Sequence, residues 1–210
     1  MMRKLPTMTV KRMPVLAVAM ASLALAGCVS LGGGDPPESL LTLTSIETAA
    51  VGSGAAAGGE TNRGAIAVLT PETPAKLDVV RVPVQVSDTS IAYLAEAVWV
   101  EKPARLFRRL LGETLRARGA ALVLDTDDTP MLAAQTLRGT LMEMTYDATS
   151  SSVIVRFDAV RTTGDGTTVS RRFEARESGI LPEAGDVGPA INRAANTVAN
   201  EVAEWMVGGA

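Results

Sequence analysis

Side chains able to carry out catalysis are scarce in this sequence of 210 residues. It contains no histidine and a single cysteine, Cys28. Ser-His-Asp triads, Cys-His pairs and zinc sites that use histidine are therefore excluded. Neither a GxxxxGK[ST] loop nor a GxGxxG loop follows an expected strand, so the sequence carries no nucleotide-binding motif.

Three carboxylates crowd together at Asp125, Asp127 and Asp128. Neighbouring carboxylates can have well-separated pKa values, which is what glycosidase-type acid–base catalysis requires. The cluster is also a candidate for a divalent cation, but it lacks the glycine at position six and the glutamate at position twelve of an EF-hand loop. Threonine and proline residues surround it, which favours a solvated turn, and we expect no metal site.

The single cysteine stands in a context that predicts covalent modification by lipid. Residues 1–12 carry four positive charges and residues 13–25 form a short apolar run, the two parts of a signal peptide. The run is too short to cross a bilayer. It ends in Leu25, Ala26, Gly27 and Cys28, and this order of small residues before a cysteine is typical of a lipobox. We expect removal of residues 1–27, after which Cys28 carries diacylglycerol and an N-acyl chain.

The acyl chains predict both the location and the attachment of the protein. Each buried CH₂ contributes about 0.8 kcal/mol, so two or three chains on Cys28 hold a protein stably on a membrane. Val29 rather than aspartate follows Cys28, which indicates the outer membrane, with the domain on its periplasmic face. We expect no cofactor apart from these covalent acyl chains.

The charge of the processed chain excludes one class of partner. Four of the 20 basic residues precede Cys28, whereas all 23 acidic residues follow it. Residues 28–210 therefore have 16 basic and 23 acidic side chains and a formal charge of −7. Nucleic-acid binding depends on Lys and Arg that neutralise phosphates, so we expect no nucleic acid partner.

The processed chain divides into a tether and a domain. Residues 28–39 are rich in Gly, Pro and Ser, which predicts a flexible tether after the acylated cysteine. Residues 40–210 are long enough for one domain. Within it, residues 49–64 are rich in Ala and Gly and are expected to form a mobile loop.

Periodicity predicts the elements of this domain. An apolar stretch over residues 40–46 comes first, and Pro83 indicates an edge strand or a bulge. The tryptophans, Trp99 and Trp205, lie in apolar patterns typical of a core. The strands are expected at residues 65–69, 79–86, 91–100, 121–124, 133–147, 151–161 and 168–177, and the helices at residues 103–119 and 186–207 with Asp186 as the second N-cap. We expect an α/β (α+β) fold of two layers, a mixed, largely antiparallel sheet with the two main helices on one face.

A family resemblance rests on the order of features between residues 74 and 119. Leu77-Asp78 precedes a valine-rich strand, followed by Ile91-Ala92-Tyr93 and by Ala97-Val98-Trp99-Val100. Pro103-Ala104-Arg105-Leu106-Phe107 then opens a helix that ends at Leu115-Arg116-Ala117-Arg118-Gly119. This pattern resembles the ABC-type transport auxiliary lipoprotein family, and the likeness extends over nearly all of residues 28–206.

The resemblance implies a non-catalytic, membrane-anchored subunit of a transport system. Its partners would be an MCE-domain protein and, through that protein, an ABC permease and ATPase. The cargo would be phospholipid or another hydrophobic molecule moving between the inner and outer membranes. The resemblance carries over no functional residue except Cys28, and it leaves homo-oligomerisation open.

Two other functions remain open from the sequence. One is an LPS-assembly or secretin-pilot lipoprotein, since such proteins also combine a small domain with a lipid anchor. The other is a cell-wall glycan hydrolase that uses Asp125, Asp127 and Asp128. Aromatic residues make up only 3% of the chain, which argues against the stacking platforms of a sugar-binding cleft.

Overall fold

A computed structural model describes residues 39–53, 64–120, 122–124 and 133–208. They belong to a compact unit of residues 37–210. The expected signal peptide, nearly all of the expected tether and most of the 49–64 loop lie outside the described residues. No helix within the described ranges is long and apolar enough to cross a membrane.

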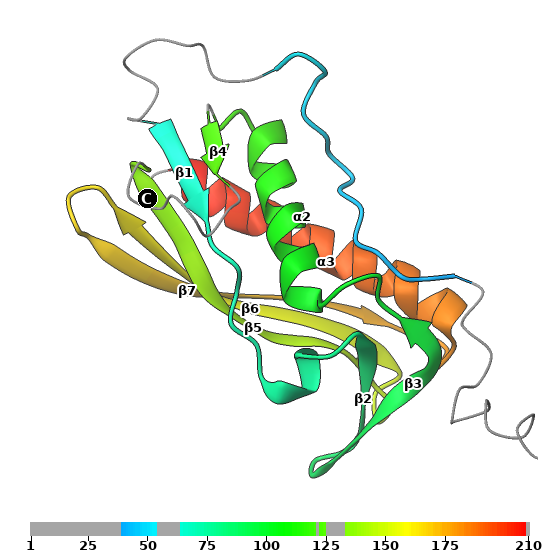
Figure 1. Ribbon diagram of the computed structural model, residues 1–210. Helices are drawn as coiled ribbons and strands as arrows, with labels where there is room; N and C mark the ends of the chain where they lie inside the picture. The colour runs from blue at the N-terminus through cyan, green and yellow to red at the C-terminus, as the bar shows by residue number, and fades with distance from the viewer. Residues whose placement is uncertain (1–38, 54–63, 121, 125–132, 209–210) are drawn as a thin grey trace, which may run out of the picture. The chain divides into compact units, whose positions relative to one another are not determined.

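The strand at the centre of the sheet is β5 (Gln135–Asp147). One edge of it pairs along its full length with β6 (Ser152–Thr163), which in turn pairs with β7 (Thr168–Ser178), and both pairings are antiparallel. Turns join these three strands directly, so they form the meander that the sequence predicts (Figure 1).

The other edge of β5 is shared by two short strands. β1 (Ala65–Val68) pairs in parallel with the first part of β5, and β2 (Arg81–Ser87) pairs in parallel with its last part. β4 (Leu122–Leu124) extends the sheet beyond β1, and β3 (Ser90–Val98) extends it beyond β2. The β2–β3 hairpin consequently forms one end of the sheet (Figure 1).

Both long helices cover the same face of this sheet. In α2 (Pro103–Ala117), Phe107 packs edge-on against Phe157 of β6, with ring centroids 5.3 Å apart. In α3 (Ala184–Val207), Trp205 lies 5.7 Å from Phe173 of β7. Phe157 and Phe173 are cross-strand partners and therefore point to one side. The structure thus confirms the predicted two-layer fold, with a mixed, largely antiparallel sheet.

Alternation along β6 decides which face the helices cover. Val153, Val155 and Phe157 are fully buried beneath them, whereas Arg156 and Asp158 lie on the opposite face and remain partly exposed. The two tryptophans are buried in the core, as the sequence predicts, with exposed fractions of 2% for Trp99 and 9% for Trp205. The sheet therefore has one covered face and one open face.

Details at the start of the second helix and in the β2 region refine the sequence prediction. The second helix begins at Ala184 with Glu183 at its N-cap, so Asp186 is not the cap but lies in the first turn, where a negative charge favours the helix dipole. Val80, just before β2, is 40% exposed and Val86 is 50% exposed, whereas Val82 and Val84 between them are buried. Pro83 lies at a register shift between β2 and β3, which confirms the bulge and not the edge.

The apolar stretch at residues 40–46 does not form a regular strand. Residues 41–50 instead run as an extended segment over the helices, and we name this segment the strap. Leu41 forms one parallel bridge with Trp99. The side-chain amide of Asn196 in α3 then accepts a hydrogen bond from the Ile46 N–H at 2.9 Å and donates one to the Thr44 carbonyl at 2.9 Å. The strap is thus held at Leu41 by backbone bonds beside β3, and farther along by side chains of α2 and α3.

Candidate functional site

The residues singled out in the sequence lie outside the part of the chain that the structure describes. This holds for Leu25, Ala26, Gly27 and Cys28 of the lipobox and for Asp125, Asp127 and Asp128. Neither lipidation at Cys28 nor a catalytic role for the aspartates is therefore tested by the geometry, and the candidate site has to be sought among the described residues.

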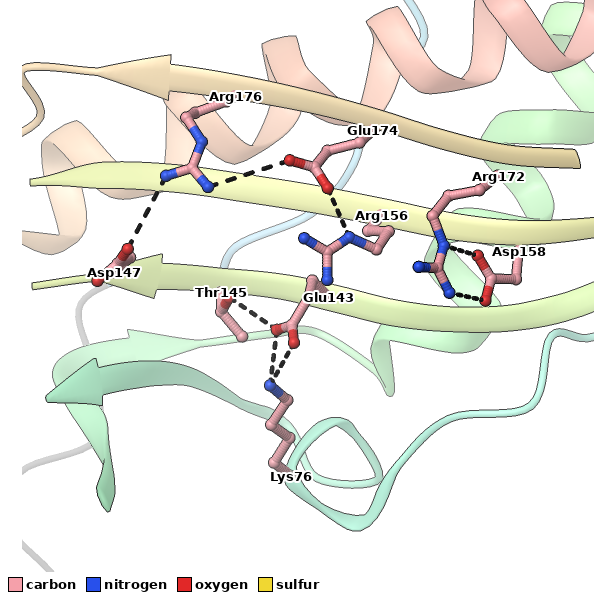
Figure 2. Close-up of polar contacts among 9 residues, drawn as sticks. All are labelled: Lys76, Glu143, Thr145, Asp147, Arg156, Asp158, Arg172, Glu174 and Arg176. Carbon is pink, nitrogen blue, oxygen red and sulfur yellow. Dashed lines mark hydrogen bonds and ion pairs between the residues drawn. The ribbon is translucent and has the colours of Figure 1, made fainter. Parts of the chain in front are cut away.

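The open face of the sheet carries the largest group of interacting charges described in the structure, shown in Figure 2. We name this group the charge ladder. It consists of Lys76, Glu143, Asp147, Arg156, Asp158, Arg172, Glu174 and Arg176. The register of β5, β6 and β7 creates it, because Glu143, Arg156 and Glu174 occupy neighbouring positions across the three strands. Four bases oppose four acids, so the ladder is electrically balanced.

One end of the ladder contains a bidentate ion pair between Arg172 and Asp158. The Arg172 guanidinium donates from Nε and from Nη2 to the two carboxylate oxygens of Asp158, each at 2.6 Å. These hydrogen bonds stabilise the charged carboxylate and lower the pKa of Asp158 below its usual value. Asp158 is therefore ionised at neutral pH and is unsuited to donate a proton as a general acid.

The middle of the ladder connects the sheet to the segment before β2. Lys76, in the short 3₁₀ helix η2 (Ala75–Leu77), donates to both oxygens of Glu143 at 2.8 and 2.6 Å. Thr145 donates to Glu143 Oε2 at 3.0 Å. On the neighbouring strands, Arg156 Nε donates to Glu174 Oε2 at 2.5 Å. The carboxylates in this row thus all accept hydrogen bonds from fixed donors.

A shallow hollow of about 350 Å³ opens where the ladder meets the β2–β3 hairpin. Its lining includes Asp88, Glu143 and Asp147, together with Arg156. Hydrogen bonds from Ser150 and Thr149 lower the pKa of Asp147, so this carboxylate also stays ionised. The described residues include no cluster of three or more potential metal ligands, so the hollow offers no built metal site.

The chemistry of this face suits binding better than catalysis. General acids need a pKa raised toward neutrality. The shifts resolved for carboxylates in the described residues are all downward, at Asp147, Asp158 and Asp165, and arise from hydrogen bonding. A polar surface with balanced charges can form hydrogen bonds and ion pairs with a partner.

Sequence reasoning found only part of the ladder. Alternation correctly predicts that Arg156 and Asp158 share the face opposite Phe157. Their partners on β7 depend on the register set by the β6–β7 turn, and Lys76 arrives from a segment without periodicity. The alternating charges at Arg172, Glu174 and Arg176 of β7 are the signal in the sequence that could have indicated a charged sheet face.

Comparison with solved structures supports the fold. Protein XCC0632 from Xanthomonas campestris has a TM-score of 0.65 and 14% sequence identity, and the match covers 80% of this chain and 95% of that one. A crystal structure described as that of an uncharacterized protein has a TM-score of 0.61 and 13% identity, covering 80% and 99%. Identities this low show a common fold alone. Comparison with curated proteins gives no significant match.

The family comparison is more specific. The model of the ABC-type transport auxiliary lipoprotein component family matches residues 45–203, which is more than half of the chain. The match runs from the strap almost to the end of α3, so it includes the charge ladder and the covered face of the sheet. It confirms the resemblance seen in the sequence, and the chain therefore belongs to the ABC-type transport auxiliary lipoprotein component family.

Proposed function

We propose that this chain is a non-catalytic subunit of an MCE-type ABC transport system, anchored by acyl chains on Cys28 to the periplasmic face of the outer membrane. The family match over residues 45–203 carries this proposal. In this arrangement, the folded domain binds the MCE-domain protein, which is joined to an ABC permease and ATPase. The system moves lipid or another hydrophobic molecule between the two membranes.

Two further observations support the proposal. The lipobox Leu25-Ala26-Gly27-Cys28 follows a short apolar run, as expected for a lipid-anchored protein. On the open sheet face, hydrogen bonds lower the pKa of Asp147 and of Asp158, so these two carboxylates offer charged groups to a docking partner. The partner therefore supplies ATP hydrolysis, and this chain supplies attachment and contact.

Affinity purification from the native host tests the proposal. The full chain, tagged at its C-terminus, is expected to co-purify with an MCE-domain protein and to float with outer-membrane vesicles. The mass of its N-terminal peptide should show that Cys28 carries a diacylglycerol group and an N-acyl chain. Substitution of Cys28 by Ser is the matched control and should abolish acylation and flotation. Recovery of the acylated protein without MCE or ABC components would refute the transport role.

A further inference from the structure

The β2–β3 hairpin and the residues beside it present a stripe of exposed and half-buried side chains on the side of β3 away from Trp99. We name it the hairpin stripe, and it consists of Leu40, Arg81, Ile91, Tyr93, Val98 and Val100. Leu40 is 51% exposed, Ile91 47% and Val100 54%, which is high for aliphatic side chains. Exposed apolar side chains that lie side by side on a protein surface often mark an interaction site.

Backbone pairing places all six side chains on one side. Leu41 and Trp99 pair in parallel, so Leu40, Val98 and Val100 point away from the side on which Trp99 is buried. Backbone hydrogen bonds join Leu41 N to the Val98 carbonyl at 2.7 Å and Val100 N to the Leu41 carbonyl at 2.9 Å. The stripe therefore starts where the strap leaves β3.

The antiparallel pairs of the hairpin continue the stripe. Val98 faces Arg81, and Tyr93 faces Pro83, which follows Arg81 by two residues and so shares its side. The Arg81 guanidinium lies 5.1 Å from the centroid of the Tyr93 ring, which joins the two parts across the bulge. Ile91 lies two residues from Tyr93 on the same side. The stripe thus combines aliphatic groups, one tyrosine and one cation, and the exposed Glu96 lies at the bulge between Tyr93 and Val98.

This composition fits a lipid surface. Aliphatic side chains enter the boundary between headgroups and acyl chains, and tyrosine rings favour that boundary because they are amphipathic. The stem of an arginine lies on apolar surface while its guanidinium reaches the phosphates. Arg81 thus gives the stripe one positive charge that can meet the phosphates of a bilayer.

The position of the lipid anchor in the sequence favours the same face. Leu40 follows Cys28 by 12 residues. At about 3.3–3.6 Å per residue, that length of chain reaches at most about 40 Å. Leu40 is itself a member of the stripe, so every other described part of the domain is farther from the anchor along the chain. The tether therefore keeps the stripe closer to the membrane, on average, than the parts of the domain that follow later in the chain.

We infer that the hairpin stripe is a second membrane contact, which lies against the bilayer that holds the acylated Cys28. This inference rests on the anchoring proposed above and extends it, because the domain is then oriented on the membrane and does not hang freely from its tether. The β2–β3 hairpin would point to the lipid. Gln85 pairs with both Ile91 and Asp147, so the stripe adjoins one end of the charge ladder, and the part of the ladder on β7 would remain accessible to protein partners.

Site-specific fluorescence in vesicles tests the inference. In the acylated full chain, the Cys28 sulfur is blocked, so a cysteine introduced by Val100→Cys is the only free thiol and accepts a nitrobenzoxadiazole label. The matched control is Ser170→Cys, at an exposed position on β7 at the other edge of the sheet. The vesicles contain phosphatidylethanolamine and phosphatidylglycerol with a doxyl-labelled lipid as quencher. The label at position 100 should be quenched severalfold more than the label at position 170.

Other results separate this inference from the proposed function. Leu40→Asp in the Val100→Cys background should reduce the quenching to the level of the control, because a charge removes the apolar contact. If the labelled chain floats with vesicles but both positions are quenched equally, the inference is wrong while the anchor stands. Protection of position 100 from aqueous iodide without quenching by the doxyl lipid would show a protein in contact with the stripe, which also overturns the inference. A chain that carries an unmodified Cys28 and does not float overturns both.

Discussion

The hydrogen bonds of Asn196 predict how firmly the strap is held on the helical layer. The Asn196 side chain is only 2% exposed, and its amide bonds the Ile46 N–H and the Thr44 carbonyl of the strap. A second bond from Nδ2 reaches the Asn192 carbonyl one helical turn earlier at 2.8 Å and fixes the orientation of the amide. Asn196→Ala removes both strap bonds with little effect on helix propensity.

The size of the effect follows from the number and environment of these bonds. A protein hydrogen bond contributes about 1 kcal/mol net, and a buried group left without a partner costs about 1–3 kcal/mol. Water can reach the strap once it lifts, which limits the penalty for the orphaned backbone groups. We therefore expect Asn196→Ala to lower the free energy of unfolding by about 2–3 kcal/mol. Asn192→Ala removes a single bond, to the Thr44 N–H at 2.8 Å, and should cost about 1 kcal/mol or less.

Two measurements on the processed protein check this prediction. Urea unfolding followed by tryptophan fluorescence reports on the whole core, because both tryptophans are buried in it. Hydrogen exchange read by mass spectrometry reports on the strap peptide, which should exchange much faster in Asn196→Ala than in Asn192→Ala. If Asn196→Ala unfolds at the same urea concentration as the wild type and its strap exchanges equally slowly, the strap is not held by this side chain.

Three further predictions concern the sheet and its two faces. Gly139→Ala would place a Cβ 2.1 Å from the Asp158 carbonyl oxygen, so we expect a loss of about 3 kcal/mol in urea unfolding or no soluble protein. Phe107→Ala removes the ring packed on Phe157 and should cost about 3–5 kcal/mol in the same assay. The lowered pKa of Asp158 contributes stability that is present above the unfolded-state pKa, near 4, and is lost as the pH falls through the folded-state pKa. Asp158→Asn should therefore make stability decline less steeply below about pH 4, as measured by urea midpoints across pH.

The regular elements could be predicted from the sequence because their periodicity reflects burial. The valines and Phe157 of β6 alternate with polar residues, and the leucines of α2 recur at helical spacing, so each element indicates its covered side. The strap could not be predicted in this way. Its exposed and partly buried residues alternate as in a strand, yet beyond Leu41 its hydrogen-bond partners are side chains of helices that come much later in the sequence, Glu113 of α2 and two asparagines of α3.

The helix start shows a second limit of local signals. Asp186 is a good N-cap residue with apolar residues after it, so the local pattern favours a start there. The observed N-cap lies three residues earlier, at Glu183, which has the extended conformation of a cap and whose carbonyl accepts a hydrogen bond from Val187 N. Asp186 still stabilises the helix, but through its charge in the first turn and not through a capping hydrogen bond.

The candidate sites differ in how much of them is local. The lipobox is a run of four residues, so sequence alone predicts it completely. The charge ladder depends on register across three strands and on Lys76 from another segment, which alternation cannot supply. The hairpin stripe depends on which side of β3 the chain at Leu40 joins, and that follows only from the bridge to Trp99.

The two proposed contact surfaces have opposite characters, and this difference has a physical consequence for the ladder. Exposed ion pairs contribute about 0–1 kcal/mol each, so the ladder adds little to the stability of the fold. An uncovered sheet face made of aliphatic residues would be an aggregation site, and a balanced set of charges prevents this without adding to the net negative charge of the domain. Such a face binds a partner through matching polar groups. A bilayer would favour the neighbouring hairpin stripe over the ladder, because burying the ladder's ion pairs in lipid is far more costly than burying aliphatic side chains.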